Sequence, residues 1–246
     1  MSEEILRAMM ELFALIVKQD GGMLRSERDY VSEFLTRQLT HRNADEFMDL
    51  FLESSGPLRG NTAKSEAESS NVRDSIRIFR NCTKINKTLT QEQRVIVLLR
   101  CFELIDSGRQ YTLQRMNIIN TIAEVFMISQ VEFGAIMLFV KAERKEDFAD
   151  PSMLVVSTGT SSEQQGDNDQ FIVFLKVSSV NLYFLRSFHP DITLLNGLRL
   201  TPRKVYTFAP GSSVQATPAP PVYYSDIISQ FISDKDIHRI SFVADQ

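Results

Sequence analysis

Two similar loops of this chain carry carboxylates that could act together. The sequence around Asp20 is LFALIVKQDGGMLRSERDYVSEFL, and the sequence around Asp106 is LLRCFELIDSGRQYTLQRMNIINTIAEVF. Each copy predicts an amphipathic helix, a short loop that opens with Asp, and a second amphipathic helix. Asp20, Glu27 and Asp106 are the oxygen donors available to a hard divalent cation, which prefers several oxygen ligands. A turn-forming role is the simpler interpretation, because Asp bonds its own backbone in tight loops.

The two copies differ at one position that matters for metal binding. Matching the apolar pair Tyr30–Val31 to Ile118–Ile119 places Arg115 opposite Glu27. A cation at a ligand position repels a metal ion. In a duplicated bundle both loops should emerge on the same side, with Asp20 and Asp106 within reach of one bridging ion or basic side chain. We expect Arg115 to point toward its own acidic loop as an exposed cation, so that Arg115→Glu barely changes stability.

Other reactive side chains give no recognisable active site. Cys82 and Cys101 lie among apolar neighbours, no CxxC is present, and buried thiols behave as small hydrophobic groups. His41, His189 and His238 are scattered along the chain. The sequence has no GxxxxGK[ST], G-x-S-x-G, HExxH or dinucleotide-binding glycine motif. We therefore predict no catalytic and no cofactor-binding residue.

Composition narrows the class of protein. The 246 residues carry a formal net charge of −4 and show no evident basic stripe, so we expect no nucleic-acid partner. The apolar runs are too short to span a bilayer, and the acidic start MSEEILRAMM lacks the positive charge of a secretory signal. These features predict a cytoplasmic protein without direct membrane insertion.

The hydrophobic period changes along the chain. Helical spacing predicts seven helices over residues 3–145 and a mobile loop at 54–71. The expected N-caps are Ser26, Thr90, Thr112 and Ser129. After residue 150, β-branched and aromatic runs predict short strands, with a type I′ hairpin at Asn196-Gly197 and one short helix, DIISQFI. The expected fold class is α+β, with an all-α domain at 1–147 and a small β-rich domain at 152–246.

The two halves resemble parts of known families. The helical half, with its paired Asp loops, resembles the TerB-like family named from tellurite resistance. That resemblance implies a divalent-metal site built from Asp20, Glu27 and Asp106, from which Arg115 departs. The β half, with LLNGLRL, KVYTFAPGSSV and PVYYSDIISQFI, is similar to the segment that follows a TerB-like domain in certain bacterial ABC-transporter ATP-binding proteins. Its LNG…PGSS pattern also resembles the second half of a forkhead-associated (FHA) fold.

These resemblances imply a non-catalytic accessory or regulatory N-terminal region that docks to an ATPase domain or a membrane transporter complex. ATP would then bind in a downstream domain, and the protein would lie at the inner face of the membrane. The alternative is a stand-alone metal-binding TerB-like stress-response protein. Phosphopeptide capture by an FHA-like domain needs a positioned Arg and a Ser or His on loops. Arg186 and Ser187 fall within a predicted strand, so we expect no such capture.

Overall fold

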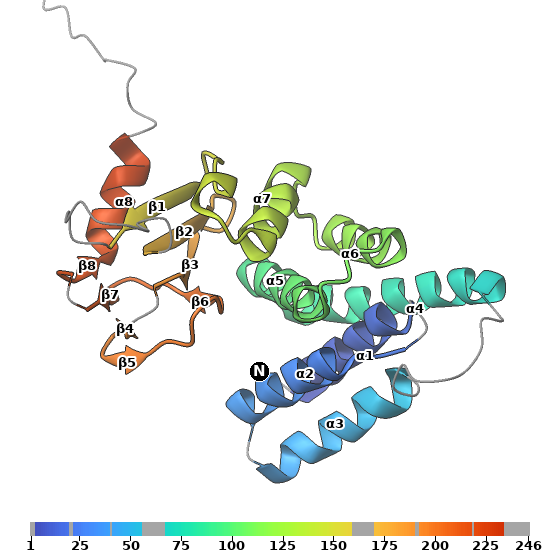
Figure 1. Cartoon of the computed structure of the whole chain (residues 1–246). Coiled ribbons are helices and arrows are strands. Elements are labelled where there is room, and N and C mark those ends of the chain that lie inside the picture. The colour runs from blue at the N-terminus through green and yellow to red at the C-terminus, as the bar shows by residue number, and fades with distance from the viewer. Residues whose placement is uncertain are drawn as a thin grey trace, which may run out of the picture. The chain divides into compact units, whose positions relative to one another are not determined.

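The computed structural model describes residues 3–19, 22–39, 41–55, 67–158, 170–189, 192–217 and 219–233. The chain divides into two compact units, Met1–Val140 and Lys141–Gln246 (Figure 1). Helices form the first unit and two antiparallel sheets form the second, which confirms the predicted α+β fold class. Within the described ranges, no helix is long and apolar enough to cross a membrane.

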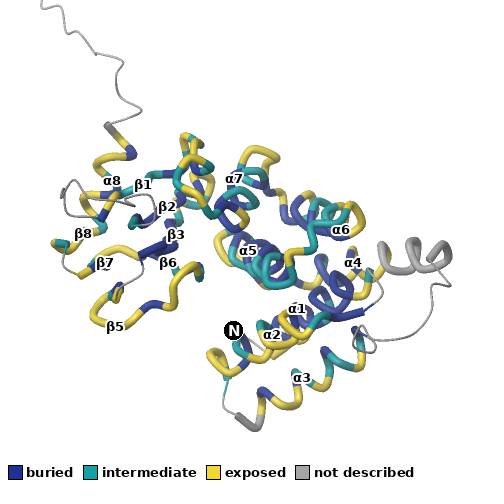
Figure 2. The backbone as a smooth tube through the Cα atoms, viewed as in Figure 1, coloured by how far each residue is buried: buried dark blue, intermediate teal, exposed yellow. Residues whose placement is uncertain are grey.

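The helical unit is organised around its first helix. α1 buries eleven of its residues, from Ile5 to Val17, and packs against α3, α4 and α5. A helix that is apolar on nearly every side is typical of a core helix rather than a surface one. Figure 2 shows this burial as the dark blue course of α1. The helices are α1 (Glu3–Lys18), α2 (Arg25–Gln38), α3 (His41–Ser55), α4 (Ala67–Thr88), α5 (Gln91–Gly108), α6 (Leu113–Val125) and α7 (Gln130–Lys141).

In the helical unit, the helix starts follow the predicted capping residues in three of four cases, and the hydroxyl of Ser129 accepts a hydrogen bond from the Glu132 amide at 3.2 Å at the start of α7. Thr90 accepts a hydrogen bond from the backbone of Gln93, and Thr112 accepts one from the backbone of Arg115. The prediction of Ser26 as a cap is wrong, because α2 begins one residue earlier, at Arg25, after Leu24. The side chain of Glu27 instead accepts a hydrogen bond from the Leu24 amide at 2.8 Å, which satisfies one orphan donor of the helix start.

The predicted loop at 54–71 is helical at both ends. α3 continues to Ser55 and α4 begins at Ala67, so helix covers residues that the Gly, Pro and Ser content assigned to the loop. The remaining residues, 56–66, lie outside the described part of the chain.

The second unit contains two four-stranded antiparallel sheets. One has the order β1-β2-β3-β6 and the other the order β5-β4-β7-β8. The sequence did not predict β1, β7 or β8, and the predicted strand RISFV lies outside the described residues. The strands are β1 (Met153–Ser157), β2 (Phe171–Val177), β3 (Leu182–Ser187), β4 (Thr193–Leu195), β5 (Leu198–Arg199), β6 (Tyr206–Thr207), β7 (Ser213–Ala216) and β8 (Val222–Tyr223).

The Asn196-Gly197 hairpin is confirmed. Leu195 pairs with Leu198 across a two-residue turn, and φ is 50° at Asn196 and 81° at Gly197. Positive φ at both central residues is the requirement of a type I′ turn. Asn196 adds side-chain bonds to β7, because its carboxamide oxygen accepts from the Ser213 amide at 2.9 Å. The turn is thereby fixed to the next strand of its sheet.

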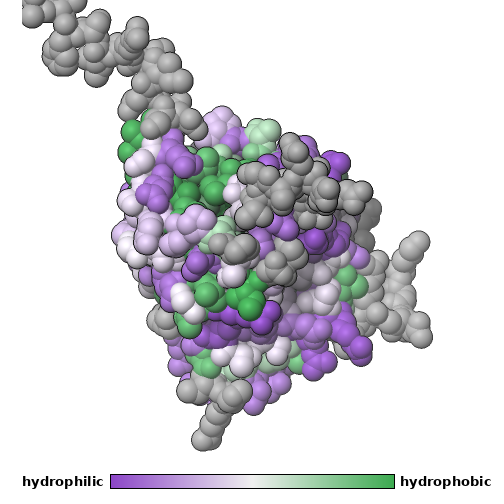
Figure 3. All heavy atoms as spheres, turned by 60° about the vertical axis from the view of Figure 1, so that its left-hand side comes forward, coloured by the Kyte–Doolittle hydropathy of each residue, from purple (hydrophilic) through white to green (hydrophobic). Residues whose placement is uncertain are grey.

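Both sheets and the last helix, α8 (Tyr224–Ser233), share one core. Tyr183 of β3 packs against Tyr224 and Phe231 of α8, with ring centroids 5.5 and 5.8 Å apart. Ile172 and Val214 bring the two sheets into the same cluster. In the space-filling view of Figure 3, hydrophobic surface near the end of α8 forms small areas bordered by hydrophilic side chains. The unit therefore has its own apolar interior.

Candidate functional site

The position at which the two helical copies differ is also the place where they meet. Arg115, at the start of α6, donates through Nη1 to the Glu27 carboxylate at the start of α2. Both side chains are completely buried, with 0% exposure. The second carboxylate oxygen of Glu27 accepts from the Leu24 amide. Residues that are equivalent in sequence are thus neighbours in space.

Further contacts tie the helix ends of both copies to this pair. Nη2 of Arg115 donates to the carbonyl of Val17, in the last turn of α1, at 3.3 Å. Gly108, the last residue of α5, approaches so closely that an added Cβ would lie 2.7 Å from Oε1 of Glu27. The ends of α1 and α5 and the starts of α2 and α6 therefore converge on one buried ion pair. This convergence agrees with the duplication inferred from sequence.

The expectation that Arg115 is an exposed cation of its own loop is wrong. Its guanidinium lies in the core and faces the carboxylate of the other copy. A buried guanidinium without its carboxylate would remain charged in a medium of low polarity, which is costly. Arg115→Glu would place two carboxylates together at this point, so the expected small effect on stability is replaced by a large one.

The predicted metal ligands have other partners where the structure describes them. Oδ1 of Asp106 accepts from the Tyr111 hydroxyl at 2.8 Å and lies 3.7 Å from Nε of Arg109. Asp20 lies outside the described residues. In the described part of the chain, no three His, Cys, Asp or Glu side chains are grouped as a metal site would require. With Arg115 against its carboxylate, the surroundings of Glu27 do not fit a divalent ion.

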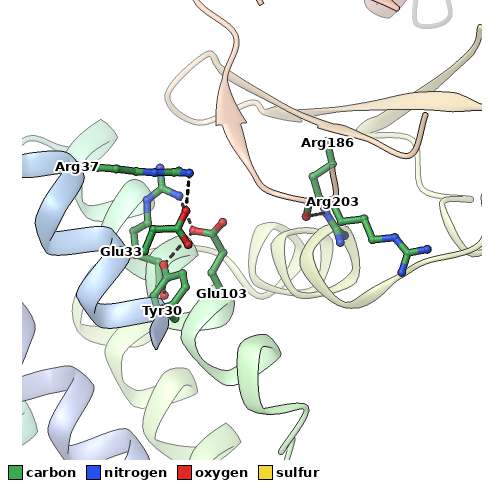
Figure 4. Close-up of polar contacts among 7 residues, drawn as sticks. Tyr30, Glu33, Arg37, Glu103, Arg186 and Arg203 are labelled. Carbon is green, nitrogen blue, oxygen red and sulfur yellow. Dashed lines mark hydrogen bonds and ion pairs between the residues drawn. The ribbon is translucent and has the colours of Figure 1, made fainter. Parts of the chain in front are cut away.

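A second polar group links α2 to α5 and was not recognised from the sequence. The Tyr30 hydroxyl lies 3.1 Å from a carboxylate oxygen of Glu103, which also pairs with Arg100 (Figure 4). Burial, followed by the negative charge of Glu103, raises the pKa of Tyr30 well above its usual value. The phenol therefore stays protonated and acts as a fixed donor between the helices. The neighbouring Glu33–Arg37 pair is half-exposed, with 2.6 Å between its charged atoms.

In the β unit, the polar residues of β3 hold the backbone. Nε of Arg186 donates to the carbonyl of Arg203 at 2.9 Å (Figure 4). Its Nη1 donates to the carbonyl of Ala142 at 3.1 Å. Arg186 is 2% exposed. Ser187 is also buried, and its hydroxyl lies 2.8 Å from that of Thr193. Neither side chain is presented on an open loop, the position that phosphopeptide capture needs.

The two cysteines are buried and free. Burial raises the pKa of Cys82 to about 12, and burial together with the charge of Cys82 raises the pKa of Cys101 even further. A thiolate is the reactive form of cysteine, so both side chains are inert at neutral pH.

Comparison with known proteins identifies the helical unit. The sequence model of the family described as "Tellurite resistance protein TerB" matches residues 6–138, which is more than half of the chain. No match was found among curated proteins or among solved structures. The matched range contains both Asp loops and the Glu27–Arg115 pair.

Proposed function

The chain belongs to the TerB family, and we propose that it is a non-catalytic docking module of a larger transport machine. In this proposal the TerB domain and the small β-sheet domain form the regulatory N-terminal region of a bacterial ABC-transporter ATP-binding protein. A downstream domain binds and hydrolyses ATP, and the protein lies in the cytoplasm at a membrane transporter complex. The link to the transporter rests on the order of the two resemblances along the sequence.

The observation that supports the non-catalytic role is the state of five potentially reactive side chains among the described residues: Glu27, Tyr30, Cys82, Cys101 and Arg115. Glu27 and Arg115 neutralise each other in the core, and the Tyr30 hydroxyl is bonded to Glu103. Both thiols are buried with raised pKa values. Catalysis needs a group that is within reach of substrate and able to exchange protons or attack. Here these groups support the fold.

Two kinds of experiment test the proposal: sequencing of the gene downstream of residue 246, and measurements of ATP binding and hydrolysis. We expect the reading frame downstream of Gln246 to encode a phosphate-loop lysine within about a hundred residues, because ATPase domains carry this motif early. The corresponding full-length protein should hydrolyse ATP, whereas the 246-residue chain should bind none by calorimetry. Removing residues 1–246 should change the regulation or the complex formation of the ATPase and leave its basal hydrolysis in place.

Two outcomes would reject this function. Tight ATP binding by the 246-residue chain would show a nucleotide site that its sequence motifs do not predict. A downstream frame without any phosphate-loop lysine would remove the transporter link, and the stand-alone metal-binding protein would then be the function to test.

A further inference from the structure

Two consecutive helices of the chain, α3 and α4, expose charge of opposite sign in the same pattern. The outer face of α3 carries four exposed acidic side chains, and the outer face of α4 carries four exposed basic ones. The acidic stripe consists of Asp45, Glu46, Asp49 and Glu53. The basic stripe consists of Arg77, Arg80, Lys84 and Lys87. Sequence reading missed the basic stripe because apolar residues of the buried face separate its members in the chain.

Among the residues that the structure describes, neither stripe has an ion-pair partner. Both helices pack against α1, each through its apolar face. No hydrogen bond or ion pair involves the eight charged side chains in the described part of the chain. Four like charges within three helical turns repel one another, so each stripe is stabilised by a surface of opposite sign.

Each stripe also has an apolar border on the same side. At about 100° per residue, the basic stripe covers an arc of about 80° and the acidic stripe one of about 100°. The side chains of Ile76 and Phe79 are 63% and 61% exposed. Both lie beside the basic arc, on the side where the angle around the helix axis is smaller. The half-buried Leu52 and Met48 lie next to the acidic arc on that same side. The two surfaces therefore share one layout and differ in sign.

This layout selects the direction in which the stripes fit. Along α4 the basic side chains after Arg80 are Lys84 and Lys87, at steps of four and then three residues. Read backwards along α3, the acidic side chains after Glu53 are Asp49 and Glu46, at the same steps. At a rise of about 1.5 Å per residue, opposite charges then meet along the whole contact. The steps also fit a parallel pairing, but only antiparallel helices bring both apolar borders to the same side.

We propose that these stripes form an interface between two copies of this chain. α3 of one copy lies antiparallel against α4 of the other, which pairs Glu53 with Arg80 and Asp49 with Lys84. In this assembly a two-fold axis repeats the contact, so that α4 of the first copy also lies against α3 of the second. In this register Phe79 of one copy lies beside Leu52 of the other, within about two residues along the helix axis. The assembly is a closed dimer held by charge at its centre and by apolar contact along its border.

Light scattering coupled to size exclusion tests this dimer on the whole chain. At about 100 µM chain and about 50 mM NaCl, where screening is weak, we expect twice the chain mass of 28.1 kDa. The double reversal Arg80→Glu/Lys84→Glu should raise the dimer Kd at least about 100-fold, because like charges then face each other in both halves of the interface. The double reversal Asp49→Lys/Glu53→Lys should do the same.

Mixing the two double variants tests whether the stripes contact each other. A one-to-one mixture of the two double variants should form a heterodimer, and a chain with all four substitutions should recover the homodimer. The matched control is Arg25→Glu/Arg28→Glu, which reverses two exposed charges of α2 at similar spacing and should leave the dimer intact. Circular dichroism verifies the helical fold of each variant.

Three results would overturn the proposal. The first is a monomeric wild-type chain under these conditions, and the second is a dimer that resists both reversals. The third is a monomer whose basic stripe binds vesicles of anionic phospholipid, because the occupant would then be a lipid surface. Loss of the dimer would leave the proposed docking role intact, since the ATPase experiments do not depend on self-association.

Discussion

The buried Glu27–Arg115 pair provides the sharpest test of how this fold is stabilised. Arg115→Met removes the cation and leaves the Glu27 carboxylate in a site with no access to water. Breaking a fully buried pair in this way costs about 3–5 kcal/mol. A folded domain has a total stability of about 5–15 kcal/mol, so this one change removes a large part of it.

Urea unfolding followed by helical circular dichroism measures this effect, because the described helices lie mainly in the TerB domain. Glu27→Gln keeps an acceptor for the Leu24 amide and removes only the charge. The double variant Glu27→Gln/Arg115→Met leaves neither side chain of the pair charged and should recover part of the loss. We therefore expect a coupling energy of at least about 1.5 kcal/mol in the double-mutant cycle, within the range of residues in direct contact.

The exposed pair on α2 supplies the control. Arg37→Met breaks a Glu33–Arg37 pair whose side chains are 42% and 46% exposed, and such pairs contribute only about 0–1 kcal/mol. If Arg115→Met lowers the free energy of unfolding by no more than Arg37→Met does, the pair does not link the two helical copies as we argue.

Three further predictions follow from the contacts described above. Gly108→Ala should lower the free energy of unfolding, because the new Cβ would lie 2.7 Å from Oε1 of Glu27. Gly134→Ala, whose new Cβ would have no atom within 4 Å, should raise the free energy of unfolding by about 0.5–1 kcal/mol. Equal effects of the two substitutions in urea unfolding would argue against the close approach of Gly108 to Glu27. Above pH 9 the free energy of unfolding should fall, by at most about 1.4 kcal/mol per pH unit for each buried thiol, because Cys82 and Cys101 ionise in the unfolded chain but stay protonated in the folded one. The stabilising effect of each thiol is complete below its pKa in the unfolded chain. A free energy of unfolding that stays constant up to pH 12 would show that this effect is absent. Millimolar calcium or manganese should leave the melting temperature of the wild-type chain unchanged. An ion that bound only the native state, at a concentration of about 100 times its Kd, would add about 2.7 kcal/mol to the free energy of unfolding. A clear rise of the melting temperature would therefore favour the metal-binding alternative.

The elements that could be predicted from sequence are those with a local cause. Thr90 and Thr112 cap their helices through bonds to residues three positions ahead. Asn196 and Gly197 form their turn because both tolerate positive φ. β1 was missed because its sequence, MLVVS, is a short apolar run between Pro151 and a polar segment. Such runs are ambiguous until a partner strand, here β2, fixes their conformation.

The candidate site shows where local reasoning ends. Aligning the copies correctly placed Arg115 opposite Glu27, but position in an alignment does not say that the two side chains touch. That contact arises because two equivalent helix starts approach each other in the bundle. Burial then reverses the energetic conclusion, since a pair that contributes little in water becomes costly to break in the core.

The same reasoning separates the charges that build this TerB domain from those that could recruit a partner. Glu27 and Arg115 are matched one to one and fully desolvated, so their energy goes into the fold. A metal ion at this place would link the helix ends only when bound, whereas a guanidinium is covalently part of the chain and always charged. Arg115 therefore joins the ends of α1 and α5 and the starts of α2 and α6 through a charge that is part of the chain. The stripes on α3 and α4 are exposed and have no ion-pair partner among the described residues of one copy, so we expect a partner surface of opposite charge to bind there.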